Sequence, residues 1–304
     1  MNNPRNPVTR RDFLRGAAGM TLAGLTAGSS CADSASVNPK DKTGRKSRVV
    51  LIRDKDILTG QGDVVESRMQ DMLDEAVCAL MEEEKAAKAW ARLFEPEDVV
   101  GIKSNVWRFL PTPGELHNAI RTRLLERGVN MENMDFDDRG VRRNPVFAKA
   151  TALINTRPMR THHWSGVGSL LKNYIMFSDS PPSWHADACA DLGGLWELPP
   201  VKGKTRLNIL VMLTPLFHGK GPHHYQGRYI WPYKGLIVSR DPVAADAAGL
   251  RILEAKRREH FGKDLPFAVS PKHIQVAEEK YGLGVASPDR IELIRLGWME
   301  EALI

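Results

Sequence analysis

Short apolar runs alternate with amphipathic stretches along this chain. The runs at 49–52 and 99–102 are branched and uninterrupted, as buried strands are. Between them, apolar residues recur at 65, 69, 72, 76 and 80, which is the spacing of one helix face. The pattern therefore predicts a strand, one long helix within residues 64–94 and a second strand.

The alternation continues to the end of the chain. A helix is predicted from Leu116 to Glu126, ended by Gly128. N-cap residues before proline, at Asp241-Pro242 and Ser270-Pro271, predict two further helix starts. Apolar runs predict strands at 134–136, 152–154, 207–213, 235–239 and 291–295. These elements predict an α/β fold with a mixed, largely parallel sheet flanked by helices.

The amino-terminal segment has the pattern of a twin-arginine export signal. Arg10 and Arg11 are followed by Phe13-Leu14 and by an uncharged, Gly/Ala-rich run over 16–30. We expect residues 1–31 to be a signal peptide read by the twin-arginine translocation machinery, and the folded protein to be periplasmic or otherwise extracytoplasmic. Lipid attachment at Cys31 is the alternative that would anchor the protein to a membrane.

Charge and composition set the domain organisation. Removing residues 1–31 takes away four arginines and one aspartate, so the net charge falls from +6 to +3. Residues 32–47 are polar and show no periodicity, which predicts a flexible linker before a single α/β domain over 48–304. No uncharged stretch after residue 31 approaches the ~20 residues that span a bilayer. Basic residues are dispersed among acids, which argues against a nucleic-acid partner.

The cysteines restrict the cofactors. After Cys31 the chain holds only Cys78 and Cys189, without a C-x-x-C spacing. This chain alone therefore builds neither an iron–sulfur cluster nor a tetrathiolate zinc site. A disulfide between the two is the alternative to the two free, buried thiols that we expect, because Cys78 lies in a helical pattern.

Histidines supply the first candidate chemistry. All nine follow residue 116, and six lie in three short places, at 162–163, at 185 and over 218–224. Imidazoles with a carboxylate suit a divalent transition metal, and the candidate ligands are His163, His185, His218 and Asp246. Because adjacent residues on an extended segment point to opposite sides, at most one of His162 and His163 is expected to face a common site. Histidines grouped by chance are the alternative.

Polar residues at strand ends and in glycine-rich loops supply further candidate site residues. The candidate catalytic residues are His162, His163, Lys172 and Asp246. The candidate substrate-binding residues are Lys103, Asn105, Asn173, Gly221 and His223. Lys103 and Asn105 follow a predicted strand, where open α/β sheets place ligands. The alternatives are a solvated strand end and, for residues 219–227, a plain surface turn.

Several signatures are missing. The glycines over 161–173 do not match the phosphate loop, which needs Gly-x-x-x-x-Gly-Lys followed by Ser or Thr. The acidic turn at 135–140 begins like a calcium loop, but its fifth position is Arg139 and its twelfth is Val146. The sequence also has no Gly-x-Ser-x-Gly elbow and no His-Glu-x-x-His, so serine-hydrolase and zincin mechanisms have no sequence support.

Taken in order, six motifs resemble the domain of unknown function 362 family over residues 48–297. They are VVGIKSN at 99–105, the segment 161–173, His185, GKGP at 219–222, SRDPVAAD at 239–246 and YGLG at 281–284. The resemblance implies an α/β fold with a site shared by the Lys-Asn, His and Asp-Pro-Val-Ala-x-Asp segments, and implies no established reaction. Other members carry a ferredoxin-like domain that this chain lacks. Members often have an acid at Thr214, and its loss weakens a metal site unless His218 replaces it.

Three functions follow as expectations. The first is an exported enzyme, metal-dependent or redox-associated, that acts on a small polar or anionic molecule. The second is a non-catalytic metal- or ligand-binding accessory protein of an exported redox system. The third is a metal-free enzyme in which Lys172 and His163 transfer protons beside tryptophans 107, 164, 184, 196 and 231.

Overall fold

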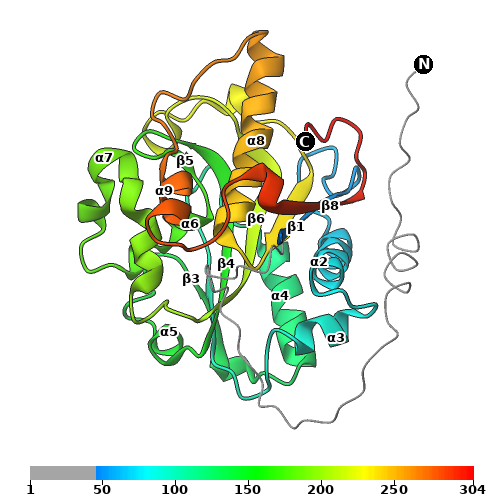
Figure 1. Cartoon of the computed structure of the whole chain (residues 1–304). Helices are drawn as coiled ribbons and strands as arrows, with labels where there is room; N and C mark the ends of the chain where they lie inside the picture. The colour runs from blue at the N-terminus through cyan, green and yellow to red at the C-terminus, as the bar shows by residue number, and fades with distance from the viewer. Residues whose placement is uncertain (1–45) are drawn as a thin grey trace, which may run out of the picture.

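The computed structural model describes residues 46–304, so the predicted signal peptide and nearly all of the predicted linker lie outside the described residues. One sheet has the strand order β3-β2-β4-β6-β7-β1-β8, with β5 paired to β4 (Figure 1). Its strands are β1 (Ser47–Arg53), β2 (Val100–Lys103), β3 (Met134–Asp137), β4 (Ala152–His162), β5 (Gly166–Gly168), β6 (Thr205–Leu216), β7 (Gly235–Ser239) and β8 (Ile291–Gly297). Only the pairs made by β5 and β7 are antiparallel within the described residues. The predicted α/β class with a mixed, largely parallel sheet is confirmed.

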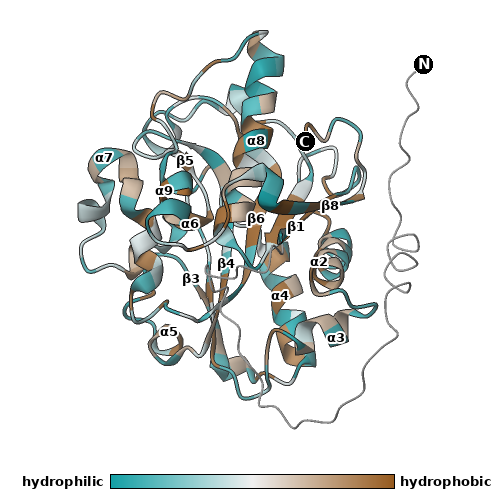
Figure 2. Cartoon of the chain, viewed as in Figure 1, coloured by the Kyte–Doolittle hydropathy of each residue, from teal (hydrophilic) through white to brown (hydrophobic). Residues whose placement is uncertain are grey.

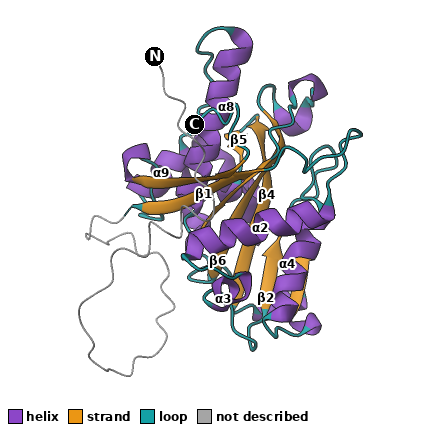
Figure 3. Ribbon diagram, turned by 90° about the vertical axis from the view of Figure 1, so that its right-hand side faces the viewer, coloured by secondary structure: helices purple, strands orange, loops and turns teal. Residues whose placement is uncertain are grey.

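Helices cover both faces of the sheet. They are α2 (Glu66–Met81), α3 (Ala86–Ala91), α4 (Gly114–Glu126), α5 (Pro145–Lys149), α6 (Leu170–Asn173), α7 (Ala186–Cys189), α8 (Pro242–Phe261) and α9 (His273–Glu279). One hydrophobic core lies between the sheet and α2, α3 and α4, with α2 crossing in front of the strands in Figure 3. The other lies between the opposite face and α6, α8 and α9. Figure 2 shows the central strands as hydrophobic, which is expected of a sheet buried on both faces.

Several element boundaries differ from the prediction. The helix expected within residues 64–94 divides into α2 and α3, because Glu82 adopts a left-handed φ of 58° and begins a run of three glutamates. Negative charge at a helix carboxyl end opposes the helix dipole. Strand β4 is much longer than predicted and runs through Arg157 to His162. This extension carries the residues of the candidate site.

The cap predictions have opposite outcomes. Asp241 caps α8 as predicted, since its Oδ1 accepts from the N–H groups of Val243 at 2.9 Å and Ala244 at 3.0 Å. Ser270 does not cap α9, which begins at His273 with Lys272 at the N-cap position and no side-chain hydrogen bond there. Cys78 and Cys189 are buried and form no disulfide within the described residues, as predicted. None of the helices between residues 46 and 304 has the length and apolar character needed to cross a membrane.

Candidate functional site

The carboxyl ends of β2 and β4 lie side by side where the chain reverses direction across the sheet. After β2 the chain passes through α4 to the edge strand β3, and α4 packs on one face. After β4 it passes through α6 to β6 in the other direction, and α6 packs on the opposite face. Open α/β sheets bind ligands outside such a reversal. The topology therefore marks these strand ends as the candidate site.

Lys103, the last residue of β2, is fully buried at these strand ends. Its Nζ donates to Asp138 Oδ1 at 2.5 Å, to the carbonyl of Ser104 at 2.7 Å and to Asn173 Oδ1 at 3.3 Å. Burial lowers the pKa of Lys103 to about 8, although Asp138 opposes the shift. Burial also penalises the Asp138 carboxylate, but Lys103 outweighs it and the pKa of Asp138 is lowered. The two residues form a paired ammonium and carboxylate.

Two arginines of β4 lie buried beside this pair. Arg157 is 4% exposed and Arg160 is 3% exposed, and burial lowers the pKa of Arg157 to about 10 and that of Arg160 well below its ordinary value. Arg160 Nη1 donates to Asn105 Oδ1 at 3.2 Å, and its guanidinium lies 4.6 Å from the centre of the Trp107 ring. The Nε atoms of both arginines are buried without a hydrogen-bond partner in the described part of the chain. Donors of this kind are costly unless something accepts from them.

Lys172 of α6 is the fourth buried cation, at 3% exposed. Its Nζ lies 3.5 Å from the Sγ of Cys189, and burial lowers its pKa to about 8. Burial raises the pKa of the Cys189 thiol. Asp187, Ala188 and Cys189 have φ values of 48°, 58° and 61°, each a conformation that costs about 1–3 kcal/mol. This backbone holds Cys189 against a lysine whose pKa suits proton transfer.

Lys103, Arg157, Arg160 and Lys172 together are called the cation cluster. Two buried carboxylates influence it, Asp138 and Asp246. Asp138 is paired with Lys103, whereas Arg157, Arg160 and Lys172 form no salt bridge within residues 46–304. Buried charges are stable when paired, so the cation cluster has the electrostatics of an anion site.

Asp246 holds α6 in place. The carboxylate is fully buried and accepts from Ser169 Oγ at 2.6 Å and from the N–H groups of Leu170 and Leu171, both at 2.9 Å. Burial raises its pKa to about 6, with these hydrogen bonds opposing the shift. Because the N–H donors belong to the first turn of α6, the carboxylate of Asp246 fixes the position of Lys172 two residues later.

Asn173 is tied to the sheet rather than directed to an open cavity. Its Nδ2 donates to Asn155 Oδ1 at 2.8 Å, and Asn155 Nδ2 donates to the carbonyl of Leu170 at 3.1 Å. In the sheet register Asn155 lies between Lys103 on β2 and Asn208 on β6. These buried polar residues form a row across three strands that anchors α6.

An imidazole cluster, His162, His163, His185 and His223 with Trp164, lies at the end of β4. The rings of His162 and His163 stack at 4.7 Å, and His223 meets His163 at 4.2 Å. Trp164 lies 4.1 Å from His185. The two rings lie against each other rather than on opposite sides of an extended segment, because β4 ends at His162 and the chain turns there. Burial lowers the pKa of His163 to about 4, aided by His223 and Lys172, so this imidazole is neutral at pH 7.

The four candidate metal ligands do not form one group. His218 lies among Tyr229, Phe261 and Arg257, whose Nη1 is 2.8 Å from the His218 Nδ1. Asp246 has both oxygens occupied by the donors of α6. Between residues 46 and 304 no three His, Cys, Asp or Glu side chains are arranged to hold a metal ion. His163 and His185 lie near each other: both rings contact Trp164, and Lys172 helps to lower the pKa of both imidazoles.

The glycine-rich loop at 219–227 packs against the end of β4. Gly221 has a φ of +67°, and a Cβ there would overlap the carbonyl oxygen of Thr161. Tyr225 from the same loop stacks on Phe109 at 4.2 Å and meets Trp107 at 5.6 Å. The loop after β6 and the loop after β2 therefore contact each other.

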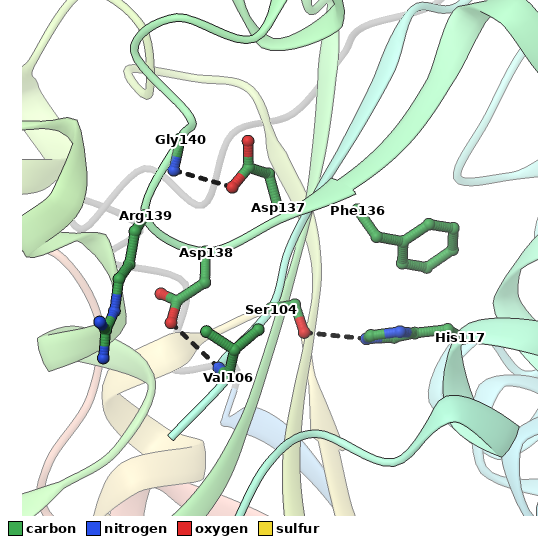
Figure 4. Close-up of a pocket in the computed structure, with 8 residues that line it drawn as sticks. All are labelled: Ser104, Val106, His117, Phe136, Asp137, Asp138, Arg139 and Gly140. Carbon is green, nitrogen blue, oxygen red and sulfur yellow. Dashed lines mark hydrogen bonds between the residues drawn. The ribbon is translucent and has the colours of Figure 1, made fainter. Parts of the chain in front are cut away.

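A cavity of about 330 Å³ opens on the other side of the Lys103–Asp138 pair. Its walls are Ser104, Val106, His117, Phe136, Asp137, Asp138, Arg139 and Gly140. In Figure 4 the Ser104 hydroxyl and the His117 imidazole face each other, and Ser104 Oγ lies 2.9 Å from His117 Nε2. Two hydrogen bonds between Asn105 and Thr112 close the loop that connects β2 to α4.

Sequence reasoning missed Arg157, Arg160, Asp138, Ser104 and His117. The arginines were missed because a charged residue after an apolar run marks the end of a strand, whereas β4 continues as a buried strand. The rule that selected Lys103, a polar residue at the carboxyl end of a strand, also applies to Ser104 and Asp138. Only the fold brings His117 to Ser104.

The comparison with protein families gives one match. Residues 130–251 match the family described as Domain of unknown function (DUF362). The comparisons with curated proteins and with solved structures found no match. The matched range contains Asp138, Arg157, Arg160, Lys172 and Asp246. The resemblance to the domain of unknown function 362 family is confirmed over residues 130–251.

Proposed function

We propose that this protein binds a small molecule through an anionic group in the cation cluster and performs acid–base chemistry on it. One observation carries the proposal. Three buried cations, Arg157, Arg160 and Lys172, have no carboxylate partner within residues 46–304, at the strand ends where this class of sheet binds ligands. A phosphate or carboxylate group would accept from the unpartnered Nε atoms.

Each residue has a distinct role in this proposal. Arg157 and Arg160 hold the anionic group, and Asn105 orients Arg160 through its Oδ1. Lys172 transfers the proton, because its pKa of about 8 leaves both protonation states populated near neutral pH. The neutral imidazole of His163 accepts hydrogen bonds from the ligand. Asp246 and Asn173 position α6 and do not touch the ligand.

Calorimetric titration with inorganic phosphate, in chloride-free buffer, tests the binding step. Arg157→Met removes the charge and keeps most of the side-chain volume. We expect it to weaken phosphate binding about 10- to 100-fold, since a hydrogen bond to a charged group contributes about 1.5–3 kcal/mol. Arg142→Met is the matched control, because Arg142 is half-exposed and pairs with the exposed Asp179. Equal phosphate affinity in wild type and Arg157→Met would contradict the proposal.

Thermal stability without ligand provides an independent check. Phosphate that binds only the folded state should raise the Tm of the wild type with concentration. Arg157→Met should unfold at the same or a higher temperature than wild type in phosphate-free buffer, because it removes an unpaired buried charge. Its Tm should then respond little to phosphate. A large loss of stability in phosphate-free buffer would mean that Arg157 is a structural residue.

A metal- or ligand-binding accessory protein is the second candidate. It is favoured by the imidazole cluster, where His163 and His223 lie 4.2 Å apart and His185 shares Trp164 with them. On this proposal two of these imidazoles bind a divalent transition metal without turnover. Elemental analysis of the exported protein should find about one metal per chain, and His163→Ala and His185→Ala should lose it. Equal metal content in wild type and both variants would refute this candidate.

Export by the twin-arginine machinery is proposed from residues 1–31 alone. The variant in which Arg10→Lys and Arg11→Lys are combined should accumulate inside the cell with an intact amino terminus. Wild type should be recovered outside the cytoplasm, shortened near Cys31. Mass analysis of a retained Cys31 would also distinguish cleavage from lipid attachment. Export of the double variant at the wild-type level would contradict the proposal.

A further inference from the structure

We propose that Ser104 is a nucleophile activated by His117, and that their cavity binds a small uncharged carboxylic ester. This site is separate from the anion site of the proposed function and does not depend on it. No Gly-x-Ser-x-Gly motif surrounds Ser104. The fold brings the two side chains together, Ser104 from the end of β2 and His117 from the first turn of α4. The inference rests on the geometry of these two side chains and on the walls of the cavity.

The pair has the geometry that nucleophile activation needs. Ser104 Oγ lies 2.9 Å from His117 Nε2, within the range for a nucleophile and its base. The backbone fixes the serine, because its N–H donates to the carbonyl of Asp137 at 2.9 Å and extends the β2–β3 pairing. The His117 ring packs on Phe136 with the ring centres 4.6 Å apart. Both partners are therefore held in place before a ligand enters.

The environment keeps His117 able to accept a proton. Burial lowers its pKa to about 4, and Arg121 on the same helix adds to this. The other charged groups that line the cavity are Asp137, Asp138 and Arg139. Asp138 is paired with Lys103, and Asp137 accepts from the Gly140 N–H at 2.8 Å. The imidazole is consequently neutral across the physiological pH range, as a general base must be.

The walls indicate the class of ligand. About 330 Å³ accommodates only a small molecule. Val106 and Phe136 provide apolar surface. Because Asp138 is paired with Lys103, the charges left on the walls are those of Asp137 and Arg139, which cancel, so the cavity favours a ligand without net charge. An uncharged ester satisfies both conditions. Anionic ligands are instead expected on the far side of the Lys103–Asp138 pair.

The chemical step balances without a cofactor. Ser104 Oγ bonds to the ester carbonyl carbon while its proton passes to His117 Nε2. The bond from that carbon to the alkoxy oxygen breaks, and the leaving alcohol takes the proton from His117. Water then attacks the acyl-serine, its proton returning through His117 to Ser104 Oγ, and the carboxylic acid is released.

Diisopropyl fluorophosphate, a small uncharged reagent, tests the nucleophile directly. The serine oxygen bonds to phosphorus and fluoride leaves, so intact-protein and peptide mass spectrometry report one adduct per chain and its position. We expect the adduct on Ser104 in the full-length protein, none in Ser104→Ala, and an unchanged rate in Ser178→Ala. No adduct on wild type, or an adduct that persists in Ser104→Ala, would overturn the proposal.

The rate of labelling and its pH dependence test whether His117 acts as the base. His117→Gln should lower the labelling rate about 100-fold or more, the usual contribution of a general base. In wild type the rate should stay level from pH 8 to about pH 5 and fall only as His117 is protonated near pH 4. Labelling of His117→Gln at the wild-type rate would refute the assignment. Arg142→Met, at a half-exposed residue outside both sites, should label at the wild-type rate. Labelling reports on Ser104 and the phosphate titration reports on the cation cluster, so the two tests can fail independently.

Discussion

Replacing Asp246 with alanine should destabilise the fold strongly, although the residue was selected from sequence as catalytic. The carboxylate is fully buried in α8 and accepts three hydrogen bonds from the first turn of α6. Alanine leaves the N–H groups of Leu170 and Leu171 and the Ser169 hydroxyl buried without acceptors. If this reasoning holds, Asp246 contributes to function by holding Lys172 in position.

The expected magnitude follows from the three donors. Each buried group left without a partner costs about 1–3 kcal/mol. Alanine also removes a carboxylate whose own burial is unfavourable, as the raised pKa of about 6 indicates, and this offsets part of the loss. The net expectation is a loss of about 3–5 kcal/mol, typical of breaking one side of a buried polar contact. At about 2–4 °C per kcal/mol, the Tm should fall by roughly 6–20 °C.

Urea denaturation at pH 7, followed by circular dichroism, measures the loss. Asp191→Ala is the matched control, since Asp191 also pairs with two side chains, Lys280 and Tyr281, but at the surface. Exposed pairs contribute about 0–1 kcal/mol, so the control should stay close to wild type. An Asp246→Ala protein within 1 kcal/mol of wild type would refute the anchoring role. It would also restore Asp246 as a candidate ligand or acid–base group.

Three further predictions concern backbone, charge and loop contacts. Gly221→Ala should lower the free energy of unfolding by more than Gly203→Ala, because both glycines have positive φ but only at Gly221 does a Cβ overlap a carbonyl; equal losses in urea titrations would contradict this. The free energy of unfolding should rise from pH 8 toward pH 10, by up to about 1.4 kcal/mol per pH unit for each of Lys103 and Lys172, because their pKa values near 8 rise to 10.5 on unfolding. Lys172→Met should remove about half of this slope, and an unchanged slope would argue against a buried lysine. Tyr225→Ala should increase proteolysis of the 219–227 loop by removing its contacts with Phe109 and Trp107, whereas Tyr281→Ala should leave that loop unaffected.

The sequence predicts the fold well where hydrophobic pattern alone decides the outcome. Runs such as 49–52 and 235–239 became central strands within one or two residues. It fails where buried polar residues continue an element, as in β4, because Asn155 and Arg157 break the apolar run that defines a buried strand. The register of β4 against β2 and β6 supplies their hydrogen-bond partners, and register is not visible in a single sequence.

The sequence also did not show which candidate residues lie in the cation cluster and which hold α6. Lys103 and Lys172 were selected by their local context, and both lie in the cation cluster. Asp246 and Asn173 were selected by similar reasoning, and the structure places their polar atoms in contacts that hold α6. Local sequence identifies a polar residue that a fold must accommodate. It does not distinguish one that faces a ligand from one that anchors a helix.

A residue that faces a ligand differs from one that anchors a helix in having buried polar atoms without hydrogen-bond partners in the protein. Asp246 and Asn173 are fully engaged by neighbours in the described chain, so the fold alone explains their presence. Arg157 and Arg160 are buried, and their Nε atoms have no acceptor within the described chain, which lowers stability. Such buried donors are stabilised when a bound ligand supplies their hydrogen-bond acceptors. The arginines of β4, which no motif identified, are therefore the observation that most favours the proposed anion site.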